Sequence, residues 1–125
     1  MPEISTPSGT PYETPPGAVA ALFANKRFGF PTRAAFHTVS VGITATQLLD
    51  NNPRRIAWLI VNISVNQGFA NFDNSVSSSN GIILGAAGGS ISTAVDEDGE
   101  TTGWTLFGIC TGAAGNFWVY EVICD

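Results

Sequence analysis

Few side chains of this sequence could act together in catalysis. It contains one histidine, His37, and two cysteines, Cys110 and Cys124, which are far apart along the chain. A Ser–His–Asp or Cys–His site would have to use His37, and no G-x-S-x-G motif supplies a nucleophile. A zinc site needs three or four Cys or His ligands at short spacing, which these residues do not offer. The sequence therefore predicts a protein that is not an enzyme and that binds no cofactor.

The acidic segment 96–100 is the one cluster of charged side chains that could bind a cation or a basic partner. It reads DEDGE and places Asp96, Asp98 and Glu100 at alternate positions. Carboxylates at this spacing can converge on calcium, although the full EF-hand pattern is absent. The same residues could form the solvated tip of a hairpin, or a docking site for basic residues of a neighbouring subunit. The hairpin tip is the favoured interpretation, and the other two stay open.

Packing explains the histidine and the cysteines more simply than chemistry does. His37 alternates with apolar residues in a predicted strand over 35–43, so a packed or hydrogen-bonded histidine is expected. Segments 103–110 and 116–124 are expected to form a hairpin, whose register does not place Cys110 opposite Cys124. Both are therefore expected to be small buried apolar residues, with a disulfide between sheets as the alternative.

Basic residues are confined to the first part of the chain. All five precede residue 56: Lys26, Arg27, Arg33, Arg54 and Arg55. The segment 56–125 has seven carboxylates and no Lys or Arg, so it cannot form salt bridges from its own residues. Its electrostatic complement must come from the N-terminal region or from another subunit. Arg54, Arg55 and the acidic residues of 96–100 are therefore candidates for charge pairing at an interface.

Composition also excludes several classes of function. The net charge is −5 and no basic patch follows the predicted strands, which argues against nucleic-acid binding. The uncharged stretches 56–72 and 101–120 are interrupted by polar residues and alternate like strands, so no membrane span is expected. No signal peptide is recognised, because the sequence starts without a basic n-region or an apolar h-region. Only 12% of residues are charged, which favours a protein packed against its own copies or partners.

Residues 1–33 are predicted to form an extended, proline-rich N-terminal arm. Residues 1–17 contain mainly Pro, Ser, Thr and Gly, and a short helix is predicted over 15–28 with Gly29 at its end. A helix of this length needs a surface to dock on. The arm either reaches a neighbouring subunit or folds back over its own body. Its candidate contact residues are Tyr12, Leu22 and Phe23 as apolar anchors, and Lys26, Arg27 and Arg33 as cations.

Residues 34–125 have the pattern of one all-β domain. Short apolar stretches alternate with turn residues over 35–43, 55–65, 68–73, 81–84, 90–95, 103–110 and 116–124. Seven or eight such strands indicate a single β-sandwich with a jelly-roll or immunoglobulin-like outline. In 55–65 five apolar residues are expected to face inward: Ala57, Leu59, Val61, Ile63 and Val65. Trp58 and Ile60 are expected to be covered on the other face, as in a central strand.

The order of motifs resembles that of small β-sandwich proteins found among the virion genes of tailed bacteriophages. The resemblance rests on Asn52-Pro53-Arg54-Arg55 before the main strand, then Asn80-Gly81-Ile82-Ile83-Leu84, an acidic Gly turn, and the closing Trp118-Val119-Tyr120-Glu121-Val122. It covers about residues 52–123 and leaves the arm outside. It implies a capsid decoration or cement protein of the virion, assembled in the cytoplasm of the host. Such proteins often form trimers, so the implied partners are copies of this chain and a major capsid protein.

Two other functions fit the same fold. A carbohydrate- or receptor-binding module of a virion would expose at least one of Trp58, Trp104 and Trp118. A single jelly-roll capsid subunit would form the shell itself, although the acidic body lacks a basic surface to face nucleic acid.

Overall fold

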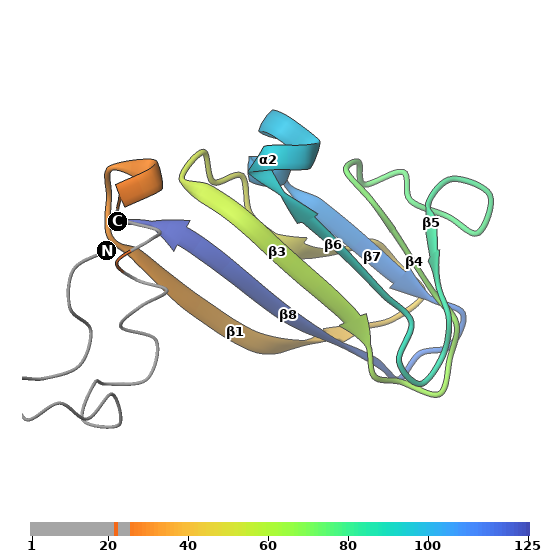
Figure 1. Ribbon diagram of the computed structural model, residues 1–125. Helices are drawn as coiled ribbons and strands as arrows, with labels where there is room; N and C mark the ends of the chain where they lie inside the picture. The colour runs from red at the N-terminus through yellow and green to blue at the C-terminus, as the bar shows by residue number, and fades with distance from the viewer. Residues whose placement is uncertain (1–21, 23–25) are drawn as a thin grey trace, which may run out of the picture. The chain divides into compact units, whose positions relative to one another are not determined.

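We describe a computed structural model in which residue 22 and residues 26–125 are defined (Figure 1). Its residues fall into two compact units. One comprises residues 34–123, here called the body, and the other comprises residues 1–33 with 124–125. No helix in the described part of the chain has the length and apolar character needed to span a membrane.

Within the described residues, eight strands form two four-stranded sheets. One has the strand order β1-β8-β3-β6 and the other β2-β7-β4-β5. The strands are β1 (Thr32–Val41), β2 (Thr46–Leu49), β3 (Arg55–Asn62), β4 (Gly68–Asn71), β5 (Ile82–Leu84), β6 (Ser90–Ala94), β7 (Leu106–Cys110) and β8 (Gly115–Cys124). The helix α2 (Val95–Asp98) and the 3₁₀ helix η2 (Gly99–Gly103) connect β6 to β7.

The strand order is that of a jelly roll. The first strand in the sequence lies beside the last, the second beside the second-last, and so on. The neighbours are β1 with β8, β2 with β7, β3 with β6, and β4 with β5. This is the arrangement of one long antiparallel ribbon that has wound around itself: every connection between consecutive strands passes from one sheet to the other except that between β4 and β5. The prediction of an all-β sandwich is therefore confirmed in its jelly-roll form.

The hairpin predicted from 103–110 and 116–124 is wrong. β7 pairs with β2 and β4 in one sheet, whereas β8 pairs with β3 in the other. The short connection 111–114 thus crosses between sheets. Both strands have alternating apolar residues. That pattern indicates that one face of each strand is buried, but it does not indicate which strand is its hydrogen-bonded neighbour. Cys110 and Cys124 are buried free thiols, as expected for small apolar residues.

The core lies between the two sheets and is made of large apolar side chains. It comprises Val41, Leu48, Leu49, Trp58, Ile60, Ala70, Leu84, Leu106, Cys110, Phe117 and Val119. The central position of β3 is confirmed, because β8 and β6 flank it. Its predicted orientation is wrong: Trp58 and Ile60 face the core, while Leu59 and Val61 are half-buried on the outer face. Both faces of this strand are apolar, so alternation alone could not identify the inner one.

The N-terminal unit is described in part. Leu22 and residues 26–28 are helical, in agreement with the helix predicted over 15–28, whose other residues lie outside the described part. Gly29 follows with a φ of 75°, the left-handed conformation in which glycine commonly ends a helix.

In the same unit, two contacts join residues at the start of β1 to the residue that follows β8. The guanidinium of Arg33 lies 2.6 Å from the carboxylate of Asp125, and the backbone N–H of Asp125 donates to the carbonyl oxygen of Pro31 at 2.8 Å. These contacts pair the beginning of β1 with the end of β8. Arg33, predicted as a cation for a partner surface, therefore has a partner within its own chain.

Candidate interaction surfaces

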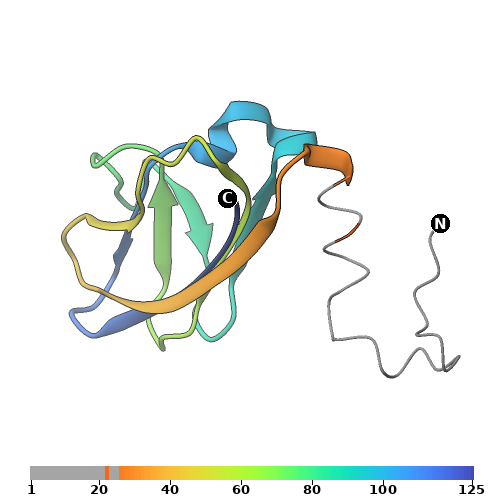
Figure 2. The same cartoon turned by 90° about the vertical axis from the view of Figure 1, so that its left-hand side faces the viewer.

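Four loops meet at one end of the body, at the lower right of Figure 1. They are residues 42–45, 63–67, 85–89 and 111–114, each of which connects strands of different sheets. Backbone hydrogen bonds join them: Ala87 N–H donates to Ser64 O at 2.8 Å, and Thr111 N–H donates to Gln67 O at 3.0 Å. Figure 2 shows α2 at the opposite end. The four loops are here called the uncharged tip.

The side chain of Asn62 holds this tip together. It is fully buried, and its amide donates to the carbonyl oxygens of Asn66 at 2.8 Å and Leu84 at 3.0 Å. Its carbonyl oxygen accepts from the backbone N–H of Ser64 at 3.0 Å and from the Ser64 hydroxyl at 2.7 Å. All four hydrogen-bonding positions of the amide are thus satisfied, which fixes loop 63–67 against the end of β5.

The Cys110 thiol lies at the base of the same tip. Its sulfur is 3.9 Å from the hydroxyl oxygen of Ser64. Burial raises the pKa of the Cys110 thiol above its ordinary value, and the contact with Ser64 opposes part of that rise. The thiol is therefore a neutral packing group at physiological pH.

The surface of the tip exposes aliphatic side chains and has no ionised side chain. None of its four loops contains Asp, Glu, Lys or Arg. Ile43, Ile63 and Val65 are exposed by 68%, 51% and 88%, among exposed Ala and Gly residues. Exposed aliphatic side chains gathered in this way mark an interaction surface more often than isolated ones do.

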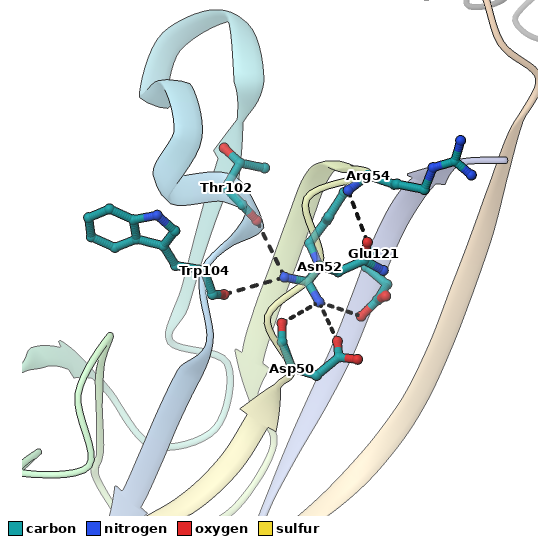
Figure 3. A network of polar contacts seen from close by, with 7 residues as sticks. Asp50, Asn52, Arg54, Thr102, Trp104 and Glu121 are labelled. Carbon is teal, nitrogen blue, oxygen red and sulfur yellow. Dashed lines mark hydrogen bonds and ion pairs between the residues drawn. The ribbon is translucent and has the colours of Figure 1, made fainter.

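The opposite end of the body contains the charged residues. Its most buried charge is Arg55, which is 2% exposed and starts β3. Figure 3 shows its network of polar contacts and labels the partners Asp50, Thr102, Trp104 and Glu121. Its guanidinium lies 2.8 Å from the Asp50 carboxylate and 3.7 Å from that of Glu121. It also donates to the backbone oxygens of Thr102 at 3.5 Å and Trp104 at 3.4 Å. One side chain thus joins β3 and β8 of one sheet to segments next to β2 and β7 of the other.

This network corrects the role predicted for Arg55. A guanidinium with no exposed side-chain surface cannot present its charge to another subunit, so Arg55 is a structural residue of the body. Its Nε atom is buried without a hydrogen-bond partner, although the other nitrogens are well supplied. The neighbouring Arg54 is exposed, and its backbone N–H donates to the Asn52 side chain at 2.9 Å.

The acidic segment is helical rather than the tip of a hairpin. Asp96 and Asp98 lie in α2, and Glu100 lies in η2; all three are exposed. The Asp98 carboxylate accepts a hydrogen bond from the backbone N–H of Ala94 at 2.9 Å, which orders the start of the turn. The hairpin was expected because strand, acidic turn and strand follow one another in sequence. In the structure β6 and β7 belong to different sheets, so the segment must span between them.

A small pocket adjoins this helical connection. It has a volume of about 240 Å³ and is lined by Asn51, Pro53, Arg55, Val95, Gly99, Glu100, Gly103 and Trp104. Trp104 is 43% exposed, and its ring meets Phe72 edge-on at 5.8 Å. Among residues 22 and 26–125, no group of three or more Asp, Glu, His or Cys side chains could hold a metal ion. The calcium interpretation therefore gains no geometric support.

The predicted arm residues are described only in part. Tyr12 and Phe23 lie outside the described residues. Leu22 and Lys26 are exposed, and the guanidinium of Arg27 lies 5.4 Å above the aromatic ring of the next residue. His37 in β1 is exposed rather than packed, which corrects its expected role.

Three aromatic rings form a second feature, here called the aromatic ladder. It lies on the outer face of the β1-β8-β3-β6 sheet. Phe36 and Trp118 have ring centroids 6.2 Å apart, and Trp118 stacks on Tyr120 at 5.8 Å with an interplanar angle of 12°. Val61 pairs with Trp118 and Leu59 with Tyr120 in the register of β3 and β8. The rings therefore stand beside an apolar sheet surface.

Sequence reasoning did not find either surface. The tip loops are short and far apart in the sequence, and only the strand order brings them together. The absence of charge from all four loops was the available signal. The ladder joins β1 to β8, and this pairing was hidden because β8 was expected to pair with β7.

Comparisons with known proteins add little to this picture. No family model and no curated protein matches the chain. It is similar to a solved structure described by the words "Bacillus endospore appendages form a novel family of disulfide-linked pili", with a TM-score of 0.45 and 13% sequence identity. That match covers 74% of this chain and 86% of the other.

Proposed function

We propose that the chain is a non-enzymatic structural subunit of a bacteriophage virion, a capsid decoration or cement protein that works as a homo-oligomer. The observation that supports this most is the separation of charge and apolar surface between the two ends of the body. One end has the exposed side chains of Ile43, Ile63 and Val65 and no charge. The other end has the exposed carboxylates of α2 and η2 and the Arg55 network.

The tip is suited to permanent burial against another protein. Docking it covers aliphatic surface worth about 25 cal/mol per Å² and desolvates no ionised side chain. Glycine and alanine in loops 85–89 and 111–114 permit close approach of a partner backbone. The acidic ends repel one another, so copies associate through their tips with the acidic ends apart. A shell-stabilising protein requires this kind of fixed orientation.

The test is the self-association of the purified full chain, measured by sedimentation equilibrium. The tip variant combines Ile43→Asp with Val65→Asp, and the control combines Asn74→Asp with Ser78→Asp, two exposed positions outside the tip. Both variants add two negative charges. We expect the wild type and the control to form the same oligomer, a trimer in the decoration-protein interpretation, and the tip variant to sediment as a monomer. A monomeric wild type at about 100 μM would exclude the proposal, since stable interfaces persist well below that concentration.

The cement role itself is tested with purified phage capsids that lack this protein. Adding the wild type should raise the temperature at which the capsids break, and the tip variant should not. If the tip variant raises this temperature as much as the control variant does, the tip does not contact the shell.

A second candidate function is binding of a carbohydrate, and the exposed Trp104 favours it. Its ring lines a pocket of about 240 Å³ together with the polar side chains of Asn51 and Glu100. An exposed aromatic ring beside hydrogen-bonding groups suits a sugar ring. A glycan array compares the wild type with Trp104→Ala: glycans bound only by the wild type support this function, and no binding by either removes it.

The jelly-roll order also suits a subunit that forms a shell by itself, because this fold is common among viral capsid proteins. Electron microscopy of the chain expressed alone decides between the two. Closed shells support this role, and small discrete oligomers support decoration.

A further inference from the structure

The aromatic ladder is an accessible platform on an uncharged sheet face. Phe36 is exposed by 68%, and Trp118 and Tyr120 are half-buried beside it. Side chains on one face of a strand are two residues apart, so Thr38 and Ser40 follow Phe36 on this face, and Asn116 precedes Trp118. The platform thus combines three rings with neutral hydrogen-bonding groups. Aromatic side chains are the groups that recognise proline-rich segments in the polyproline II conformation.

The sequence before the described residues contains such a segment. Five of the seven prolines precede Leu22. Residues 6–17 read as three tetrads that each begin with Thr-Pro: TPSG, TPYE and TPPG. Pro7, Pro11 and Pro15 therefore recur at intervals of four residues, and Glu13 is the only charged residue among the tetrads.

A short stretch of the tetrad segment is long enough to cover the ladder. The centroid separations of 6.2 and 5.8 Å place the rings of Phe36 and Tyr120 at most about 12 Å apart. A polyproline II chain rises about 3.1 Å per residue, so two prolines four residues apart are also about 12 Å apart. About four residues of such a chain therefore reach across the ladder, and any four consecutive residues between Pro7 and Pro15 include at least one proline. Proline-rich segments are already extended when free, so binding orders them at low entropic cost.

We propose that the aromatic ladder binds the Thr-Pro tetrads of a second copy of this chain. The choice of a second copy rests on the proposed function, because a segment held by its own body would not link subunits. The tip then supplies one contact between copies and the tetrads supply another. A linked second contact strengthens association without any change in the first.

Two variants of the full chain test this in a complementation experiment. The ladder variant is Phe36→Ser, and its control is Ile83→Ser, a similarly exposed apolar residue on the other sheet. The tetrad variant combines Pro7→Ala, Pro11→Ala and Pro15→Ala. We expect the ladder and tetrad variants each to weaken self-association about tenfold, and the control to change it less than about twofold.

Mixing the two weakened variants identifies the source of the segment. A fluorescently labelled ladder variant retains intact tetrads, and an unlabelled tetrad variant retains an intact ladder. If the segment binds a second copy, each mixed pair has one intact contact between ladder and tetrads, and the mixture regains part of the lost affinity in a sedimentation titration. If the mixture stays as weak as either variant alone, the segment binds its own body and the proposal is overturned. The proposal is also overturned if the ladder variant alone self-associates as tightly as the wild type.

The outcomes separate this proposal from the proposed function. If the ladder variant assembles like the wild type while the tip variant is monomeric, the proposal about the ladder is wrong and the proposed structural role stands. A monomeric wild type removes both. A synthetic peptide of residues 5–17 should disperse the ladder-dependent part of the wild-type association, and it should leave that of the ladder variant unchanged.

Discussion

The side-chain amide of Asn62 donates a hydrogen bond to the carbonyl oxygen of Leu84, 3.0 Å away, and thereby joins β3 of one sheet to β5 of the other. The same amide accepts from Ser64, so one buried polar group shapes the uncharged tip. Polar groups buried in this way contribute little net energy when satisfied, but their loss is costly.

Replacing Asn62 with alanine should destabilise the fold and loosen the tip. The carbonyl oxygens of Leu84 and Asn66 and the backbone N–H of Ser64 would all lose a buried partner. We expect a loss of about 2–4 kcal/mol in the free energy of unfolding, measured by urea denaturation. The exposed Asn74→Ala should change it by less than about 0.5 kcal/mol. Equal stabilities of the two variants would show that the network is dispensable.

Replacing Arg55 with alanine should be more damaging than the same change at Arg54. The first leaves the Glu121 carboxylate, with a side chain 11% exposed, without its cation. Breaking a buried ion pair in this way costs about 3–5 kcal/mol, whereas an exposed arginine contributes at most about 1 kcal/mol. Thermal unfolding of the two variants gives the comparison. Adding Glu121→Gln to Arg55→Ala should restore part of the loss, and a further loss instead would contradict the pairing.

The sequence predicted the fold class because burial and turn residues impose local patterns. The alternation in β7 and β8 and the glycines between them identify both strands. The alternation does not identify the neighbouring strand, because β8 would show the same pattern beside β7 as beside β3. In β3, where Trp58, Leu59 and Ile60 are all apolar, even the inward face was undetermined.

Charge illustrates the same limit at the candidate sites. The sequence places Arg55 after the last lysine and before an acidic region, which suggested pairing between subunits. In the structure its partners are Asp50 and Glu121, which are 5 and 66 positions away in the sequence. The tip, by contrast, has no charged residue that could mark it as a site in the sequence. Its four loops come together only because of the jelly-roll strand order.

Two glycines of the body should respond in opposite ways to alanine. A methyl group at Gly103 would lie 2.7 Å from the backbone oxygen of Asn52, which is held in place because the Asn52 N–H donates to Gly103 O. Gly103→Ala should therefore lower stability by about 1–3 kcal/mol. At Gly85 a methyl group meets nothing within 4 Å, so Gly85→Ala should raise stability by about 0.4–1 kcal/mol. Urea midpoints measured in parallel test the pair, and a stabilising Gly103→Ala would show that the Asn52 loop can move.

The stability of the body should fall at high pH because of Cys110. Burial raises the pKa of its thiol from an ordinary value of 9.0, while the contact with Ser64 offsets part of that effect. Well below pH 9 the thiol is protonated in both the folded and the unfolded chain, so its contribution is constant. As the pH rises past 9, the unfolded chain ionises first, and the free energy of unfolding falls until the higher folded pKa is passed. Urea denaturation between pH 7 and 10.5 under reducing conditions should show this fall in the wild type and in Cys124→Ala, which retains Cys110. Cys110→Ala should show a shallower fall, and equal slopes in all three proteins would mean that this thiol does not contribute to the pH dependence.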